Sequence, residues 1–255
     1  MTQLLDSPRK VALERLYNDV LTVDASDMIW ALMGTAMHTI LERGGIDAAG
    51  MIEERLYTEI DGCRISGQFD YMDSDGIIWD WKLASVWEVM NGVKEAREEQ
   101  LNAYAYLASR NSISVKGLRV GFILRDWSPT ELLRTAGYPP HQVFVHTVSL
   151  NLLEDTELSL KERVALHRAA ALSLPECTDK ERWAKKETYA VLKGSAKRAS
   201  RVYPDEDSAQ AFAESRNDLS GRSAYRVERR PGNSIRCQSY CSVSSYCEQW
   251  KGLRR

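Results

Sequence analysis

Two acids and a lysine occupy strand positions where Val or Ile would be usual. Asp70 and Asp80 lie in two short hydrophobic runs that flank a turn, and Lys82 follows Asp80 by two residues. Residues two apart in a strand share a face, so Asp80 and Lys82 should point the same way. Carboxylates grouped in this way favour a divalent metal, with Mg²⁺ expected, while Lys82 could orient or activate the attacking water. A solvated face with an ordinary salt bridge is the alternative.

The turn between these runs reads "MDSDG", and its Asp-Gly pair is typical of a hairpin. We therefore predict strands over residues 64–71 and 77–83. Antiparallel pairing then sets Asp70 opposite Trp79 or Asp80, depending on the register. The Ile and Trp residues around the acids indicate a substantially buried hairpin, in which acids need partners.

Helical and strand patterns continue on both sides of this hairpin. Helices are expected over residues 7–21, 27–43, 95–110 and 152–172, and strands over 56–60, 118–126 and 142–150. After Pro175 the predicted elements are shorter: strands over 188–193, 199–203 and 224–229 and a helix over 205–216. We predict an α/β core over residues 1–175 and a basic module over 176–255 packed on it.

Composition narrows the class of protein. The chain has 255 residues, 44% of them hydrophobic and 27% charged, so a soluble protein with a packed core is expected. It contains no apolar run long enough to cross a membrane and no signal-peptide pattern, so a cytoplasmic location is expected. The net charge is −2, yet from Glu181 onward 16 Lys and Arg oppose nine Asp and Glu. This asymmetry suggests a polyanion partner, and a mixed-charge surface is the alternative.

A set of spaced motifs extends the hairpin. Gly67-x-x-Asp70, Asp80-x-Lys82 and Gln100-x-x-x-Tyr104 follow in this order, after Gly34-x-x-x-His38. Over residues 30–110 this pattern resembles the RecB-type nuclease domain of the PD-(D/E)XK superfamily, although Phe69 stands where that name asks for Pro. The resemblance implies a restriction-endonuclease-like α/β core, with a mixed central sheet flanked by helices.

The resemblance also implies roles for individual residues. The metal (Mg²⁺ or Mn²⁺) would be bound by His38, Asp70, Asp80 and the Trp81 carbonyl, and Lys82 would serve the attacking water. Gln100 and Tyr104 would steady Lys82 and contact DNA near the scissile phosphate. Glu54 is a weaker candidate that could be plain surface. Without the shared order, His38, Gln100 and Tyr104 would be read as ordinary helix residues.

Three cysteines gather near the C-terminus. Cys237, Cys241 and Cys247 form a C-x3-C-x5-C pattern, and a thiolate-only site needs a fourth ligand, for which we choose Cys177 over Cys63. The chemistry leaves zinc and an iron–sulfur cluster open. The resemblance to AddB-type helicase–nuclease subunits and CRISPR-adaptation nucleases favours [4Fe–4S]. In those proteins, however, the first Cys precedes the His motif and the late spacing is usually C-x2-C.

Basic residues surround these cysteines in the sequence. Lys197, Arg198, Arg229 and Arg230 are the candidates for DNA contact, and nearby aromatic residues would add stacking surfaces, as in single-strand binders. A solvated basic module is the alternative.

These features lead to one expected function and two rivals. We expect a stand-alone, phage-encoded exonuclease that hydrolyses DNA during recombination or processing in the host cytoplasm. Its partners would be single-stranded DNA or duplex ends and a single-strand annealing or recombination protein. The rivals are an endonuclease acting on structured DNA and a non-catalytic DNA-binding module with a structural metal cluster.

Overall fold

The computed structural model describes residues 1–43, 50–220 and 224–254. The chain divides into two compact units, Met1–Ala12 with Val20–Pro175 and Leu13–Asp19 with Glu176–Arg255. The short N-terminal piece belongs to the second unit because, for example, the rings of Tyr17 and Tyr246 stack with centroids 4.3 Å apart. Sequence reasoning did not anticipate this exchange, and the division into a core over 1–175 and a module over 176–255 packed on it stays a prediction.

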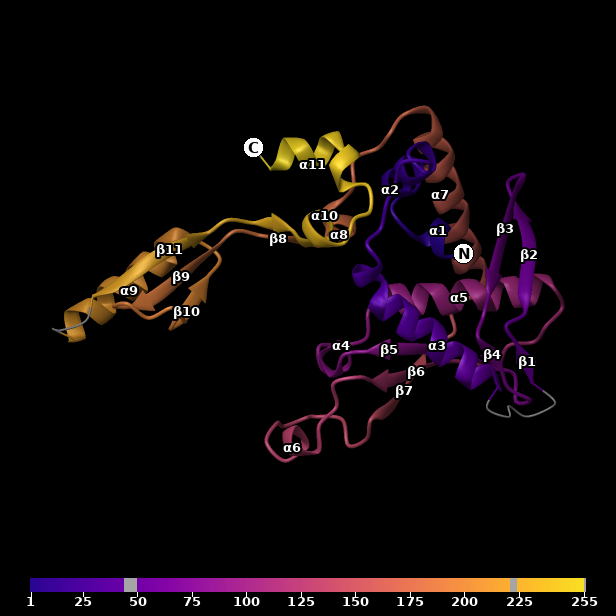
Figure 1. Cartoon of the computed structure of the whole chain (residues 1–255), viewed down its shortest axis with the longest axis horizontal. Helices are drawn as coiled ribbons and strands as arrows, with labels where there is room; N and C mark the ends of the chain where they lie inside the picture. Colours follow the sequence, from indigo (N-terminus) through magenta and orange to yellow (C-terminus); the bar gives the residue numbers. More distant parts are fainter. Residues whose placement is uncertain (44–49, 221–223, 255) are drawn as a thin grey trace. The chain divides into compact units, whose positions relative to one another are not determined.

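A mixed five-stranded sheet forms the centre of the first unit (Figure 1). Its strands, in spatial order, are β1 (Met51–Ile52), β4 (Tyr71–Met72), β5 (Ile77–Ala84), β6 (Gly117–Leu124) and β7 (Val143–Val148). Strands β5 and β6 are parallel, and the other neighbours are antiparallel. Parallel neighbours need a long crossover, and the helix α5 (Glu95–Arg110) supplies it.

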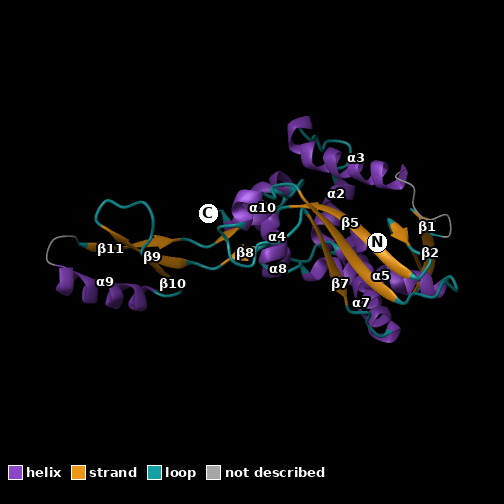
Figure 2. Ribbon diagram, turned by 90° about the horizontal axis from the view of Figure 1, so that it is seen from below, coloured by secondary structure: helices purple, strands orange, loops and turns teal. Residues whose placement is uncertain are grey.

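Helices flank this sheet. Helix α5 buries every residue from Leu101 to Ala108 and packs on α7 (Leu153–Leu172). Figure 2 shows α3 (Ile29–Arg43) along one side of the sheet and α7 on the other. The predicted α/β fold with a mixed central sheet flanked by helices is therefore confirmed. The shorter helices of this unit are α1 (Thr2–Leu5), the start of α2 (Pro8–Leu16), the 3-10 turn η1 (Ala25–Met28), α4 (Val86–Met90) and α6 (Pro129–Leu132).

The strand predicted over residues 64–71 is wrong in one respect. Strand β3 (Cys63–Gln68) pairs with β2 (Arg55–Ile60) in a separate two-stranded ribbon, and only β4 pairs with β5. The chain bends between β3 and β4, where Phe69 inserts into the core and is 1% exposed. Asp70 therefore lies in a bend just before β4, and not inside a continuous strand.

The second unit contains a smaller sheet and several short helices. Strand β9 (Thr188–Lys193) lies between β10 (Arg201–Tyr203) and β11 (Tyr225–Arg230), and α9 (Glu206–Ser220) packs on them. The remaining elements are β8 (Ala184–Lys185), β12 (Asn233–Ser234), α8 (Asp179–Arg182), α10 (Ile235–Ser239), η2 (Ser244–Tyr246) and α11 (Glu248–Leu253). In the described parts of the chain, no helix has the length and apolar character needed to span a membrane.

Candidate active site

Asp80 and Lys82 form an ion pair on β5. The alternation of the strand turns Ile78, Asp80 and Ala84 toward the core, where each is at most 2% exposed. The Lys82 Nζ lies 2.6 Å from the Asp80 Oδ2, with the lysine side chain 18% exposed. It also donates to the Trp81 carbonyl at 3.3 Å. The predicted common face of Asp80 and Lys82 is thus confirmed, and the charge of Asp80 is compensated as burial requires.

Asp70 lies beside this pair. Because Tyr71 pairs with Trp79 across β4 and β5, continuing the register sets Asp70 opposite Asp80. The Asp70 Oδ2 accepts a hydrogen bond from the Trp81 N–H at 2.7 Å. Burial, and next the negative charge of Asp80, raise the pKa of Asp70 above its usual value despite the opposing effect of Lys82. Two neighbouring acids that repel in this way favour a cation between them.

His38 reaches the same acid from α3. Its Nδ1 lies 3.4 Å from the Asp70 Oδ2, and its side chain is 25% exposed. The two residues are 32 positions apart in the sequence, and α3 contacts β5. The packing of α3 therefore brings the His38 imidazole beside Asp70.

Gln100 and Tyr104 form the helical side of the site. The Gln100 Nε2 donates to the Tyr104 hydroxyl at 2.7 Å, as expected for residues at i and i+4. Burial is the main cause that raises the pKa of Tyr104 to about 12, and the charges of Asp80 and Asp70 add to it. The Tyr104 hydroxyl therefore stays protonated near neutral pH, and it lies within electrostatic range of both carboxylates. No hydrogen bond joins Gln100 or Tyr104 to Lys82 within the described residues.

Close packing of β3 on α5 explains the glycine of the Gly67-x-x-Asp70 motif. A Cβ at this position would lie 2.7 Å from the Leu107 Cδ1 and 2.9 Å from the Tyr104 Cε1. Only glycine lets β3 approach α5 this closely. The glycine thus brings Tyr104 and the Asp70 bend to the same end of the site.

The sequence did not reveal that Glu53 holds the backbone of Asp70 in place by a hydrogen bond. The Glu53 N–H donates to the Asp70 carbonyl at 3.0 Å, and the Glu53 carboxylate accepts from the Gln68 side chain at 3.2 Å. Glu53 has a φ of 45°, which is uncommon for a residue with a side chain. Only backbone geometry reveals this role, because Glu53 has no sequence signal of its own. Its neighbour Glu54, the weaker candidate, is exposed.

The donor set fits a hard divalent cation only in part. Across the described ranges 1–43, 50–220 and 224–254, no three His, Cys, Asp or Glu side chains are arranged as a ready metal site. However, Mg²⁺ usually needs only one or two carboxylates and completes its shell with water and substrate phosphate. Asp70 and Asp80 supply those two carboxylates, although the described side chains alone do not complete a metal site.

A comparison with models of protein families identifies the superfamily of this chain. Residues 45–248 match the family model described as the PD-(D/E)XK nuclease superfamily. The chain belongs to this superfamily. The match begins after His38, so the acids, Lys82 and the Gln–Tyr pair lie within it and the histidine does not. A search of curated proteins found no match.

One solved structure has a similar fold. The structure named SSO0001 is similar with a TM-score of 0.52 and 18% identity, over 71% of this chain and 79% of that one. A phage-related exonuclease from Haemophilus somnus 129PT is more distant, with a TM-score of 0.38 and 15% identity, over 64% of this chain and 78% of that one. The first likeness supports the fold of this PD-(D/E)XK chain, and the second carries no argument.

Four cysteines of this PD-(D/E)XK chain lie in the second unit, near enough for their thiols to interact electrostatically, but among the described residues they are not arranged as a ready metal site. Cys237 is in α10, Cys241 follows that helix, Cys247 precedes α11 and Cys177 precedes α8. Burial, and then the charges of the other three, raise the pKa of the Cys237 thiol. None of the chain's five cysteines forms a disulfide in the described residues. Cys63, the rival fourth ligand, lies in the first unit at the start of β3.

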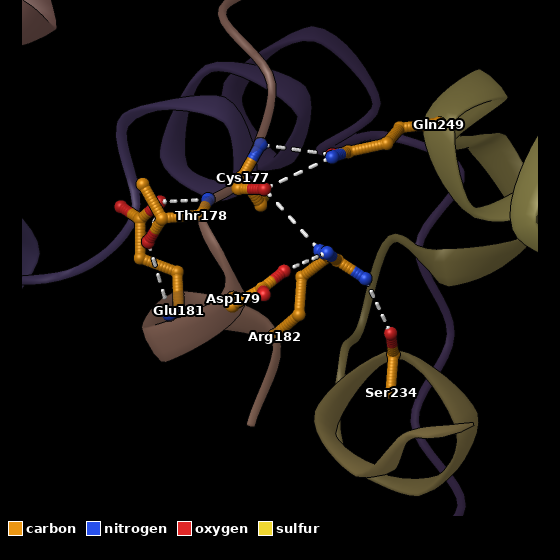
Figure 3. Close-up of polar contacts among 7 residues, drawn as sticks. All are labelled: Cys177, Thr178, Asp179, Glu181, Arg182, Ser234 and Gln249. Carbon is orange, nitrogen blue, oxygen red and sulfur yellow. Dashed lines mark hydrogen bonds and ion pairs between the residues drawn. The ribbon is translucent and has the colours of Figure 1, made fainter. Parts of the chain in front are cut away.

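The backbone of Cys177 is held in place by side chains (Figure 3). Its N–H donates to the Gln249 Oε1 at 2.8 Å, and its carbonyl accepts from the Gln249 Nε2 at 2.9 Å. Arg182 donates to the same carbonyl at 3.2 Å and to the Ser234 hydroxyl at 2.6 Å. These bonds tie Cys177 to α11 through Gln249 and, through Arg182, to Ser234 at the end of β12, just before α10.

The basic candidates differ in their environment. Arg229 pairs with Glu187 at 2.6 Å and Arg230 with Glu228 at 3.4 Å, both on or beside the small sheet. Lys197 and Arg198 are exposed in the turn region after β9, and neither has an ion-pair partner among the described residues. Arg229 and Arg230 must therefore exchange a carboxylate for a phosphate before they can bind DNA.

Proposed function

We propose that this chain is a Mg²⁺- or Mn²⁺-dependent deoxyribonuclease of the RecB-like type, acting as an exonuclease in DNA recombination or processing. The observation that carries the proposal is the convergence of Asp70, Asp80 and Lys82 in a chain of a nuclease superfamily. Loss of any of the three would have favoured a non-catalytic module. All three are present, and the buried acid has its lysine within 2.6 Å.

Each residue has a distinct task in phosphodiester hydrolysis. Asp70 and Asp80, with His38 and the Trp81 carbonyl, would hold the divalent cation, which supplies Lewis-acid polarisation of the phosphate when bound. Lys82 orients the attacking water and offsets the charge that develops on the phosphate. The protonated Tyr104 hydroxyl, held by Gln100, can donate a hydrogen bond to substrate.

The substrate and setting follow from the same proposal. A stand-alone enzyme of this type would act on single-stranded DNA or duplex ends, in the cytoplasm of a phage-infected host, beside a single-strand annealing or recombination protein. Lys197, Arg198, Arg229 and Arg230 would contribute phosphate contacts, since counterion release makes such contacts favourable.

The four cysteines of the second unit would hold a structural [4Fe–4S] cluster, with Zn²⁺ as the alternative. Support comes from their shared location and from the electrostatic influence of three thiols on the fourth. A visible absorption band from anaerobically purified protein would favour iron–sulfur, and colourless protein that contains zinc would exclude it. Cys177→Ser should lose the metal, while Cys63→Ser should keep it. The reverse result would identify Cys63 as the fourth ligand.

The catalytic assignment is tested by substitution in the full-length protein. We expect Asp80→Ala and Lys82→Ala to abolish Mg²⁺- or Mn²⁺-dependent degradation of end-labelled linear DNA. Binding in Ca²⁺ should stay largely intact. Lys161→Ala is a matched control, because it breaks another Lys–carboxylate pair, with Glu157 on α7. Undiminished cleavage by either active-site variant would refute the site.

The same assay separates the rival functions. An exonuclease should degrade linear DNA and spare covalently closed circles of the same sequence. Cleavage of closed or branched DNA would support the endonuclease instead. Binding without any cleavage by the wild-type protein would support the non-catalytic module.

A further inference from the structure

One face of α3 connects an exposed Trp–Arg pair with the proposed active site. Trp30, Gly34 and His38 follow at four-residue spacing, so they lie along one side of the helix. At one end, Trp30 is 53% exposed and the Arg125 guanidinium lies 4.4 Å from its ring centroid. At the other end, His38 contacts Asp70 at 3.4 Å. Eight residues of helix span about 12 Å between them.

Neither backbone conformation nor packing requires a glycine at position 34 in the described part of the chain. It is not among the glycines with a positive φ, and no atom lies within 4 Å of the point where its Cβ would be. A helix interior disfavours Gly relative to Ala. A bare position midway between Trp30 and His38 does, however, let another molecule approach the helix backbone closely.

Arg125 is tied to the strand that carries the active-site residues. Its N–H donates to the carbonyl of Ala84, the last residue of β5, at 3.0 Å. The neighbouring Asp126 carboxylate is engaged at the start of α4, where it accepts from Ser85 and from the Val86 N–H at 2.7 Å each. Arg125 is exposed and has no ion-pair partner among the described residues. It therefore presents a cation beside the open Trp30 ring.

We propose that this face of α3, from Trp30 over Gly34 to His38, is the path of a single-stranded DNA end into the active site. An unpaired base would stack on Trp30, a phosphate would pair with Arg125, and the sugar–phosphate backbone would cross Gly34. Aromatic faces next to cations are how proteins hold single strands without reading sequence. The inference rests on the proposed nuclease function, because it assigns the route of that enzyme's substrate.

Stacking is tested by changing the ring and the base together. Binding in Ca²⁺ is measured for a single-stranded oligonucleotide and for the same strand with abasic sites in its terminal nucleotides. Trp30→Ala should weaken binding of the normal strand about tenfold, as one lost base–aromatic stack implies. The abasic strand should bind wild type and variant alike. Trp30→Phe should recover part of the loss.

Leu32→Ala is the matched control on the same helix. Leu32 is also more than half exposed, at 57%, but lies two residues from Trp30 and hence off the proposed path. Its replacement should leave binding of both strands unchanged. An equal loss for both variants would mean that the apolar surface of α3 covers a protein partner or a second copy of the chain. Light scattering of the purified variants would then test the second copy, because loss of a dimer lowers the measured mass.

The role of Gly34 predicts opposite effects on stability and binding. Gly34→Ala should raise the melting temperature, because Ala favours helix, and should weaken binding of the normal strand. Gly252→Ala is its control, since Gly252 in α11 also has no atom within 4 Å of a Cβ position. That change should leave DNA affinity unchanged.

Besides an equal loss for Trp30→Ala and Leu32→Ala, two outcomes overturn the path and one overturns the proposed function on which it rests. The path is refuted if Trp30→Ala weakens normal and abasic strands equally, or if Gly34→Ala binds DNA as wild type does. If wild-type protein cleaves DNA in either case, the proposed function stands and only the path falls. If wild-type protein neither binds nor cleaves DNA, the proposed function itself falls.

Discussion

Gly67→Ala should damage the site through packing, without removing any chemical group. The added methyl would lie 2.7 Å from Leu107 and 2.9 Å from the Tyr104 ring, both closer than real contacts allow. Neither neighbour can retreat easily, because Leu107 is 0% and Tyr104 5% exposed within a fully buried stretch of α5. Overpacking of this kind costs about 1–3 kcal/mol in the free energy of unfolding. In a chain of this size, each kcal/mol lowers the melting temperature by about 2–4 °C.

Activity should fall further than stability. Pushing the Tyr104 ring away shifts its hydroxyl relative to Gln100 and the two acids, and small displacements of positioning groups can cost about 100-fold in rate. The measurements are urea unfolding, and kcat on linear DNA at a temperature where the variant is fully folded. Combining Gly67→Ala with Leu107→Ala should show a coupling of about 0.5–3 kcal/mol, because both changes act on one contact.

Gly117→Ala provides the matched control on β6. A Cβ there would lie 3.6 Å from Ile77, an ordinary van der Waals distance. That substitution should be neutral or stabilise by about 0.4–1 kcal/mol, since it restricts the unfolded chain. If Gly67→Ala behaved like Gly117→Ala in both stability and kcat, the close approach of β3 to α5 would have no role in the site.

Three further substitutions test other parts of the structure. Lys82→Met leaves Asp80 buried without its cation, so it should cost about 3 kcal/mol of unfolding free energy in EDTA. Asp80→Asn removes the buried charge itself and should cost less, so an equal cost for the two variants would contradict this account. Cys241→Ser should lower both metal content and melting temperature, because metal binding contributes folding energy, and retention of both would count against a metal centre. The double variant Arg229→Ala with Arg230→Ala should flatten the slope of log affinity against log salt by about one or two units. An unchanged slope would mean that Arg229 and Arg230 do not contact DNA.

Local patterns predicted the long elements well. The helix over 95–110 and the strand over 188–193 agree with the structure residue for residue, because the residues that favour each element and those that end it are close together in the sequence. The helix Val86–Met90 and the ribbon of Ala184–Lys185 with Asn233–Ser234 were missed. Elements this short depend on tertiary contacts, such as the carboxylate of Asp126 at the start of α4.

The candidate site divides in the same way. Pairs close in sequence, such as Asp80 with Lys82 and Gln100 with Tyr104, follow from strand and helix periods alone. The meeting of His38 with Asp70 depends on how α3 packs, and no local period encodes it. The family pattern supplied that expectation, as it supplied Gly67. The support from Glu53 was not anticipated, since it depends on a backbone bend that propensity does not reveal.

Three departures from local rules in the first unit lie on or beside the elements that form the candidate site, whereas the left-handed residues Asp61 and Ser112 lie in turns outside it. Asp80 carries charge at a core position, Glu53 takes a left-handed backbone and holds the Asp70 carbonyl, and Gly34 weakens the helix that bears His38. Each costs stability, and scattered through a fold they would be unrelated imperfections. Sequences satisfy local and global preferences together except where function demands otherwise, and strained residues concentrate at active sites. Asp80 lies opposite Asp70 and Glu53 donates to its carbonyl, so these two departures give a physical reason, beside the sequence motif, to place the chemistry there.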